Sequence, residues 1–386
     1  MYDRALLNRL INENKIDGKS QLINNDTFEA FEQSEFPIWK RLKVKDTTVP
    51  AYSAYNNQKV LYRKEEGLKV VPRPYQSMAL KAVFAARTYG PSEKHRLLTE
   101  VFANAGSFIE VGDNVLVHEP VILQMAMNAE NPLLLDRHTI QVGENASVTV
   151  VLDYSDDGSS VYQNSLVNIV AARGAKVHMV KIQNLGTESS HIFGGLSILA
   201  RDAEVRFNSI DLGGGITATD YSTYLEDENA TAFVDSIYIG DGEAKLDLGY
   251  NIYHNGRRTQ SDIQVKGALL EQSRKVFRGN LYFAKGAKRS KGAEQEFVIL
   301  LDQGVRADSI PALLCDEDDV QGEHAASAGQ VDANKLFYLM SRGLTEKEAK
   351  ELIVMASFAP VIEQLPIEGL KERIHTIVGE KLTQDL

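Results

Sequence analysis

The sequence predicts a mainly β protein, a parallel β-helix with helical regions on either side of it. Between Gly106 and Asp319, apolar residues alternate with other residues, which is the strand period of two. Within the same stretch, a turn followed by a small residue recurs at a nearly constant step. Helical spacing of apolar residues appears before and after it. These patterns divide the chain into regions 1–105, 106–331 and 332–386.

The first region is predicted to be mixed and mostly helical. Apolar residues recur at helical spacing from Leu6 to Ile11, which indicates a short amphipathic helix. Gly90 and Pro91 are typical of the residues that follow a helix end. Further helices are predicted over 28–36, 77–88 and 95–103, with an irregular link over 36–41.

The middle region carries a weak repeat. Its small residues Ala146, Ala175, Ala203 and Ala230 follow polar turns at steps of 29, 28 and 27 residues. A similar turn ending at Ala244 comes 14 residues later, at half that step. Such a drifting step suits a coil of strands whose corners accept insertions. An antiparallel sandwich is the alternative. A solenoid also needs its end strands covered, and the flanking helical regions could do this.

The last region is predicted to be helical. Asp332 has the chemistry of a helix N-cap, and Gly343 is typical of a helix end. Thr345 and Glu348 have the spacing of a capping box. The second helix keeps an apolar face, which either packs on the protein itself or binds a partner. Three helices are predicted, over 333–342, 346–358 and 370–382.

Composition excludes several classes of function. The formal net charge of −11 argues against a nucleic-acid surface, because phosphate binding needs a basic patch. The single cysteine allows no internal disulfide and suits a reducing compartment. No apolar run approaches the length of a membrane span, and the first residues do not resemble a signal peptide. We therefore expect a cytoplasmic protein with no membrane contact.

His324 is the candidate with the clearest chemistry. A neutral imidazole is a good ligand for iron, and a carboxylate such as Glu323 or Asp319 could orient its second nitrogen. Adjacent strand residues point to opposite faces, however, so Glu323 and His324 share a face only if a bulge intervenes. From spacing alone, a surface or interface histidine bonded to backbone is the favoured interpretation.

Cys315 lies nine residues before His324. One thiolate cannot hold an iron–sulfur cluster, which needs about four ligands. The favoured interpretation of Cys315 is a small buried hydrophobic residue on a strand. If the chain binds iron, most ligands must come from elsewhere, which indicates an interface.

Three other segments carry weaker signals. Acidic residues over 153–157 could bind calcium, but they lack the spacing of a calcium loop, so a solvated turn is favoured. Glycines over 213–215 have no following Walker residues and indicate a tight corner. Residues 254–258 are interpreted as a strand-ending turn, with a functional corner as the alternative.

The motifs toward the C-terminus resemble the SufD side of the SufB/SufD family, whose members belong to a scaffold for iron–sulfur cluster assembly. His324 begins His-Ala-Ala-Ser where the family usually has His-Gly-Ala-Thr, and near the N-terminus only Trp39 and Lys40 are similar to the family's aromatic element. The chain lacks the cysteine-bearing segments expected of SufB. The matching segments lie at 254–255, 265–269, 277–281, 318–324 and 337–344.

The resemblance implies a right-handed parallel β-helix with helical N- and C-terminal regions. It implies pairing with a SufB-like subunit through the β-helix, and docking of the SufC-like ATPase on the C-terminal helical region. His324 falls on the family's cluster-associated histidine, opposite a SufB cysteine, and Glu323 is a weaker metal candidate. No cofactor is expected to be tightly bound to the isolated chain: the cluster is transient at the interface, and ATP acts only through SufC. Partner contacts are expected at Phe337, Tyr338, Arg342, Gly343, Leu352, Ile353 and Met355.

Two functions from different classes follow. The first is a non-enzymatic scaffold subunit that completes a site on a partner. The second is a carbohydrate-active β-helix enzyme, a polysaccharide lyase or hydrolase, which would need carboxylates on neighbouring coils. The acidic residues over 153–157 with Arg257 and Arg258 are the only groups suited to that chemistry. The sequence also leaves open a homodimer through a flat solenoid face.

Overall fold

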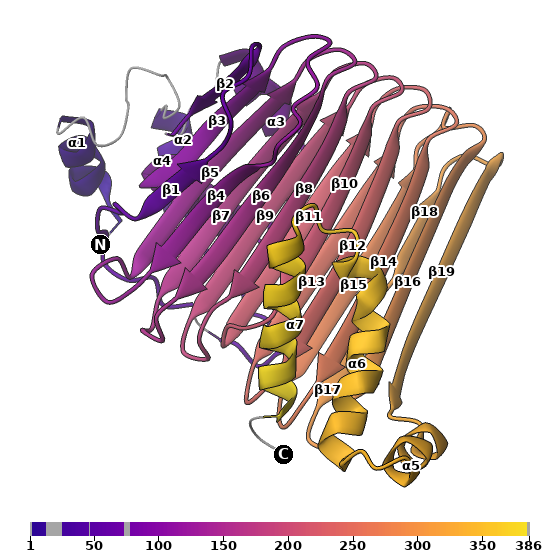
Figure 1. The fold of residues 1–386 in the computed structure, drawn as a ribbon. Helices are drawn as coiled ribbons and strands as arrows, with labels where there is room; N and C mark the ends of the chain where they lie inside the picture. Colours follow the sequence, from indigo (N-terminus) through magenta and orange to yellow (C-terminus); the bar gives the residue numbers. More distant parts are fainter. Residues whose placement is uncertain (1, 13–24, 46, 73–77, 384–386) are drawn as a thin grey trace.

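The computed structural model describes residues 2–12, 25–45, 47–72 and 78–383, and its strands form two sheets that lie face to face (Figure 1). The first sheet has the order β1-β4-β6-β8-β10-β12-β14-β16-β19, and the second runs from β17 through β15, β13, β11, β9, β7, β5 and β3 to β2, with β18 also on β15. Strands of the first sheet are β1 (Gln58–Leu61), β4 (Val121–Met127), β6 (Ser147–Asp156), β8 (Lys176–Asn184), β10 (Glu204–Asp211), β12 (Thr231–Gly240), β14 (Gln260–Leu269), β16 (Ser290–Leu300) and β19 (Val320–Gln330). Those of the second are β2 (Leu68–Val71), β3 (Ala105–Val111), β5 (Leu133–Val142), β7 (Tyr162–Ala171), β9 (Ser190–Leu199), β11 (Ile216–Leu225), β13 (Lys245–His254), β15 (Arg274–Phe283), β17 (Arg306–Ser309) and β18 (Ala312–Cys315).

The predicted parallel β-helix is confirmed. From β3 to β15 each strand pairs in parallel with the strand two places along the chain, as β10 does with β8 and β12. In the last coil β17 and β18 both pair with β15, and β19 pairs with β16. Strands from β3 to β16 therefore alternate between the sheets, and two strands make one coil. The antiparallel sandwich is excluded, because its neighbouring strands would run in opposite directions.

The repeat found in the sequence marks the stacked corners at one edge of the solenoid. Asn145, Gly174, Asp202 and Asn229 all have positive φ, between 52° and 68°. Glycine, asparagine and aspartate adopt this left-handed conformation most readily. Each donates its backbone N–H to a carbonyl of the next coil at 2.9 to 3.0 Å, as Asn145 does to Arg173. The turn before Ala244 lies between β12 and β13 at the opposite edge, which explains its half step.

Inward side chains of successive coils stack in columns because the strands are in register. Phe207, Val234 and Ile263 occupy matching positions on β10, β12 and β14, and all three are fully buried. Alternate residues on each strand face outward, so the period of two in the sequence separates core residues from outer ones.

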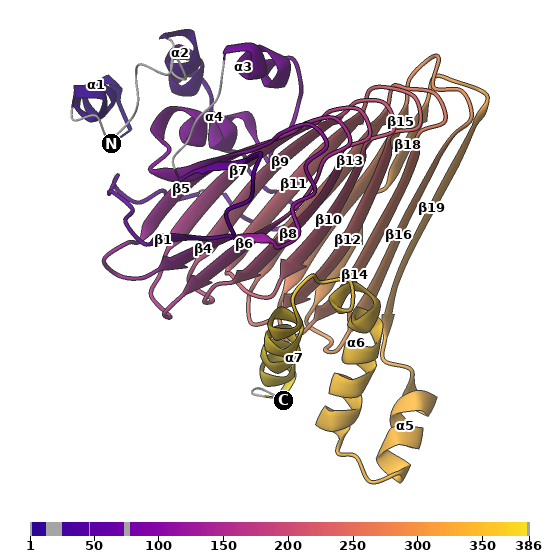
Figure 2. The same ribbon diagram turned by 45° about the horizontal axis from the view of Figure 1, so that its top comes forward.

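The helices cover the outer faces of the sheets (Figure 2). The N-terminal helices pack through an apolar cluster against outward residues of β5 and its neighbours, including Leu133 and Leu135. Two of the three C-terminal helices, α6 and α7, pack on the first sheet, where Val354 and Phe358 contact a cluster that includes Ile237. The helices are α1 (Arg4–Asn12), α2 (Asn25–Gln33), α3 (Met78–Ala85), α4 (Glu93–Phe102), α5 (Ala333–Ser341), α6 (Glu346–Ile362) and α7 (Glu368–Thr383).

The helices do not cover the solenoid's ends, although the sequence left that arrangement open. At the N-terminal end, β1 and β2 pair antiparallel with β4 and β3 and take up the first edges. At the other end, β19 and the pair β17 and β18 are the last strands of their sheets, with no strand beyond them in the described residues. The helices bury apolar residues of the outer sheet faces instead, and burial of apolar area stabilises that docking.

The helix signals of the last region are confirmed. The Thr345 side chain accepts the N–H of Glu348, and the Glu348 carboxylate accepts the N–H of Thr345, which completes the capping box. Asp332 caps α5, and Gly343 follows it with a φ of +100°. Helix α6 extends through Pro360, beyond the predicted end near Phe358, because Val361 and Ile362 are buried against the sheet.

The predicted N-terminal helices fall close to their observed bounds. Helix α2 ends before the predicted limit of 36, and α4 begins at Glu93 after the N-cap Ser92. Residue 77, the predicted start of the third helix, lies outside the described residues. Among the helices that the structure describes, none has the length and apolar character needed to cross a membrane.

Candidate functional site

The last coil of the solenoid forms an open end. Strand β19 pairs on one side with β16, and most of its residues are exposed. On the facing sheet, β17 and β18 are separated at Ile310 and Pro311. Ile310, Leu313 and Leu314 are exposed here. This open end, made by β17, β18 and β19, therefore combines unpaired strand edges with exposed apolar side chains.

His324 lies on β19 at this open end. Its register partner on β16 is Glu294, which in turn pairs with the inward residue Ile263 on β14. Residues in register on parallel strands share a face, so His324 projects toward the solenoid interior. His324 is nevertheless exposed, because β19 is the last strand of its sheet in the part of the chain that the structure describes.

Glu323 points to the opposite face from His324. The pairing of β16 with β19 is continuous from Ser290 and Val320 to Leu300 and Gln330, so no bulge brings the two side chains together. Glu323 is in register with Ala293 on the outer surface. A role for Glu323 in orienting His324 is therefore excluded by the strand geometry.

Cys315 is exposed on β18, so its interpretation as a buried hydrophobic residue was wrong. It is in register with the inward residue Phe283, and it is exposed because no strand of the described residues lies beyond β18. A Cβ built on Gly322 would lie 2.6 Å from the Leu313 side chain, which shows that these two residues face each other. Cys315 and His324 extend in opposite directions from that point, about 13 Å apart at ~3.3 Å per residue. The structure does not bring them together.

Two carboxylates face inward one coil beneath the open end, and the sequence analysis missed both. Glu296 bonds to the ammonium of Lys275 and the hydroxyl of Ser309, and accepts the hydroxyl of Tyr238 at 3.2 Å. Glu294 is 1% exposed, and neither of its oxygens has a hydrogen-bond partner. Burial, together with the neighbouring Glu296, raises the pKa of the Glu294 carboxyl to about 7. The sequence did contain a signal for this pair: Glu294 and Glu296 lie two positions apart in one predicted strand, so both were bound to face the same side.

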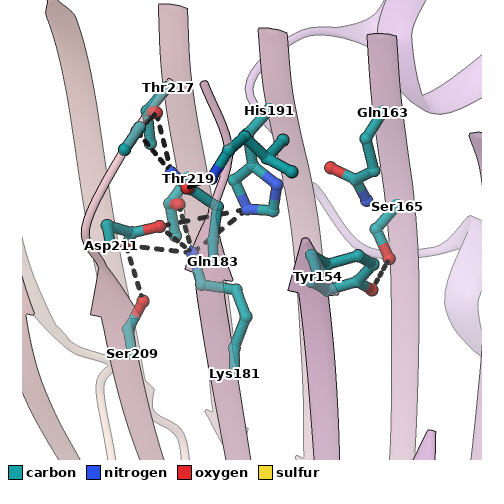
Figure 3. A network of polar contacts seen from close by, with 12 residues as sticks. Tyr154, Gln163, Ser165, Lys181, Gln183, His191, Ser209, Asp211, Thr217 and Thr219 are labelled. Atoms are coloured by element: carbon teal, nitrogen blue, oxygen red, sulfur yellow. Dashed lines mark hydrogen bonds and ion pairs between the residues drawn. The ribbon is translucent and has the colours of Figure 1, made fainter. Parts of the chain in front are cut away.

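A buried polar network lies deeper in the solenoid (Figure 3). The Lys181 ammonium donates to both Asp211 oxygens, at 2.7 and 3.0 Å, and to the Thr219 hydroxyl at 2.8 Å. His191 lies 3.4 Å from the same ammonium. Burial lowers the pKa of Lys181, and burial and the Lys181 charge lower the pKa of His191. The side chains of Lys181, Asp211 and His191 are all fully buried.

The C-terminal residues expected to bind a partner divide into two groups. On α5, Phe337 is 74% exposed and Tyr338 is exposed, with the guanidinium of Arg342 5.3 Å from the Tyr338 ring centre. Leu352 on α6 is 49% exposed. The remaining residues of the set are the half-buried Ile353 and Met355, which pack against the sheet, and Gly343, which forms the turn after α5.

The acidic residues considered for calcium are engaged in other contacts. Asp153 is buried and makes a bidentate ion pair with Arg373 of α7, at 2.7 and 2.8 Å. Asp156 accepts the N–H of Gly186 at 2.7 Å. Among residues 2–12, 25–45, 47–72 and 78–383, no group of three or more His, Cys, Asp or Glu side chains is arranged to hold a metal ion. For Asp153, the interpretation as a solvated turn was wrong, because α7 covers it.

The other two weak candidates are structural. The glycines over 213–215 form a tight corner, where a Cβ on Gly213 would lie 2.1 Å from the Leu185 carbonyl oxygen. His254 ends β13 with its ring inside the solenoid, stacked on Phe283 at 4.4 Å. The His254 ring bonds to the hydroxyls of Thr259 and Ser261 at 2.7 and 2.9 Å, and burial lowers its pKa to about 3.

We expect the protein to lose stability as the pH falls below 6.5, in part because of His254. The folded state holds this ring neutral down to a pKa of about 3, whereas the unfolded chain takes up the proton at about 6.5. Stability is therefore complete above pH 6.5 and falls by ~1.4 kcal/mol per pH unit for this histidine as the pH approaches 3. Chemical denaturation over this range should give a shallower slope for His254→Gln than for the unmodified chain. Equal slopes would contradict the assignment.

The comparisons with known proteins agree with one another. Residues 125–357 match the family described as SUF system FeS cluster assembly, SufBD core domain. The chain is 28% identical over 295 residues to the iron–sulfur cluster assembly protein SufD of Bacillus subtilis, a match that covers 75% of this chain and 68% of that protein. It is also 28% identical to SufBD family proteins of Staphylococcus saprophyticus and Staphylococcus haemolyticus, of which the match covers 62%, less than two thirds of their length.

Proposed function

Because this chain belongs to the SufBD family of the SUF system for iron–sulfur cluster assembly, we propose that it is a SufD-like scaffold subunit that pairs with a SufB-like subunit and a SufC-like ATPase. The observation that carries the proposal is the open end of the solenoid, where His324 stands exposed among unpaired strand edges. The iron–sulfur cluster is a transient product of this scaffold, which assembles it and transfers it to another protein.

The open end supports pairing with a second β-helical subunit. Strand edges expose N–H and C=O groups that another chain can bond to, and natural proteins seldom leave long edges uncovered. Strand β19 has 11 residues along such an edge. The inward-facing Leu313, which is exposed, and the partly buried Val320 add apolar area beside it. A partner that continued the two sheets would satisfy the edges and bury the apolar residues together.

The donor groups at the open end support a shared site. This chain presents one imidazole there, while Cys315 lies about 13 Å away at ~3.3 Å per residue along the strands. A cluster needs about four ligands, most of them thiolates. His324 would therefore supply one ligand, and the partner subunit would supply the others.

The C-terminal helices support docking of the ATPase. Helices α6 and α7 are fastened to the first sheet by apolar packing, and Arg373 adds its ion pair with Asp153. Helix α5 has no buried residue and carries the exposed Phe337 and Tyr338. It lies directly after β19 in the chain, so a force applied to α5 by an ATP-driven partner would act on the strand that carries His324. ATP would bind only to that partner.

The test is cluster formation in the reconstituted complex. This chain is assembled anaerobically with a SufB-like protein and a SufC-like ATPase. We expect His324→Ala to slow the appearance of the cluster's visible absorption by about 10-fold or more, as loss of a ligand does. Cluster formation at the unmodified rate would remove the role of His324.

A second variant separates the two surfaces. Phe337→Glu places a charge on the exposed face of α5, outside the strands that form the open end. It should weaken co-elution of the ATPase while leaving the SufB-like subunit bound. His324→Ala should keep both partners. If Phe337→Glu retained the ATPase at unmodified affinity, docking on α5 would be wrong.

A further inference from the structure

The carboxylate of Glu294 breaks an apolar column directly beneath His324. In register along the first sheet, the inward positions read Phe207, Val234, Ile263, Glu294 and His324. The first three are fully buried hydrophobic residues. Packing alone would favour a fourth, since a buried carboxylate without a hydrogen bond lowers stability. The exception falls one coil below the exposed imidazole.

The facing sheet leaves space for this side chain. Opposite the apolar column, the inward positions are Tyr221 on β11, Tyr250 on β13 and then Gly279 on β15. A Cβ built on Gly279 would lie 2.5 Å from Cγ and 2.6 Å from Cδ of Glu294. The Glu294 side chain thus occupies the volume that a residue at 279 would otherwise fill, and any side chain there would displace it.

Glu294 differs in its contacts from the other inward carboxylate on the same strand. Glu296 is engaged by Lys275, Tyr238 and Ser309. Both oxygens of Glu294 are buried without a hydrogen bond. The nearby Lys275 ammonium forms its ion pair with Glu296 instead. A buried acceptor without a partner can accept a hydrogen bond from a donor group at the open end, either on a bound molecule or on a side chain that rotates toward it.

We propose that Glu294 is the positioning residue of His324, accepting the N–H of one ring nitrogen so that the other nitrogen presents its lone pair to iron at the open end. The inference rests on the proposed function of His324 and names a second residue for the same site. Neighbouring parallel strands lie about 4.8 Å apart, a span that a glutamate and a histidine in register can close by rotation of their side chains. A carboxylate behind a ligating histidine fixes its tautomer and strengthens its donor nitrogen.

The first test reads the imidazole itself and needs no partner. Full-length protein labelled with ¹⁵N-histidine is measured by NMR, with the His324 signals assigned from a His324→Gln spectrum. We expect one tautomer in the unmodified chain. Glu294→Met, of similar volume, should convert it to a mixture, and Glu294→Gln, which keeps an acceptor oxygen, should have a smaller effect. Glu323→Gln, one residue away on the outer face, should change nothing.

The thermal stability of the Glu294 variants distinguishes a role in positioning His324 from a role in holding the fold together. Because no group inside the solenoid bonds to Glu294, Glu294→Met and Glu294→Gln lose at most one hydrogen bond to an exposed ring and avoid a buried charge, so their Tm should be unchanged or higher. A tautomer mixture with unchanged or raised Tm supports the proposal. An unchanged tautomer in Glu294→Met, or a change that appears only with a large fall in Tm, would overturn it.

The second test uses the reconstituted complex. Glu294→Met should reduce the Fe²⁺ retained with His324 by about 10- to 100-fold, the range found when the partner of a metal-bound histidine is removed. The two claims can fail separately. If His324→Ala leaves cluster formation intact, the proposed ligand role fails, while the NMR result still decides whether Glu294 holds the ring. If His324→Ala is inactive and Glu294→Met is fully active, the positioning role is wrong.

Discussion

Replacing Asp211 with leucine is expected to lower the free energy of unfolding by about 3–5 kcal/mol, because it leaves the Lys181 ammonium buried without its counterion. Both side chains are fully buried, and the ammonium donates to both carboxylate oxygens. Of its other neighbours, Thr219 offers a single hydroxyl and His191 is neutral, so neither can replace the lost charge. Stability is lost because the cost of removing the Lys181 ammonium from water is no longer offset by its attraction to the Asp211 carboxylate.

Chemical denaturation of three variants checks this result. Removing both partners in Lys181→Met with Asp211→Leu should restore much of the stability, since a well-packed apolar pair avoids the cost of burying charge. The matched control is Glu144→Gln, which removes an exposed ion pair with Arg173 at 2.8 Å and should cost less than ~1 kcal/mol. A double variant as unstable as Asp211→Leu would show that the packing, and not the charge, was disturbed.

Phe358→Ala is expected to lower stability by about 3–5 kcal/mol and to release the C-terminal helices from the first sheet. Phe358 is fully buried on α6, in the cluster that joins α6 and α7 to outward residues such as Ile237 and Ile239. The helices lie on the sheet's outer face, so the cavity weakens their docking and leaves the interior columns intact. The polar anchors, including Lys266 to the Ser357 carbonyl, are too few to hold them.

Limited proteolysis checks the location of this effect. Cleavage in 333–383 should become faster in Phe358→Ala, while the β-helix resists the protease as before. Leu352→Ala on the same helix is the control, because Leu352 is 49% exposed and its loss should change stability by less than ~0.5 kcal/mol. Equal protection of the helices in both variants would contradict a docking role for Phe358.

Most of the fold could be predicted from the repeat of turns in the sequence. Left-handed residues such as Asn145 and Asp202 are recognisable in a sequence because few residue types adopt that conformation easily. Their step of 27 to 29 residues measures one coil, and the alternation of apolar residues within each step assigns the inward faces. The ends were misjudged because nothing local in the helices indicates which surface they will cover.

The candidate site was predictable only in part. The motif around His324 and its resemblance to a family were visible in the sequence, and strand alternation already argued against Glu323 as its partner. Glu294 is 30 residues from His324, and its place beneath the ring depends on the register between β16 and β19. The exposure of Cys315 likewise depends on its coil being the last.

By itself the sequence determined the coil, its corners, the capped C-terminal helices and the histidine that marks the family, because each of these is encoded by residues close together in the chain. Only the tertiary structure decided that the last coil stays open, that α6 and α7 lie along a sheet face, and that an unpaired carboxylate sits under His324. Those features arise from stacking one coil on another, where packing across some thirty residues of chain sets the register and no local pattern records it.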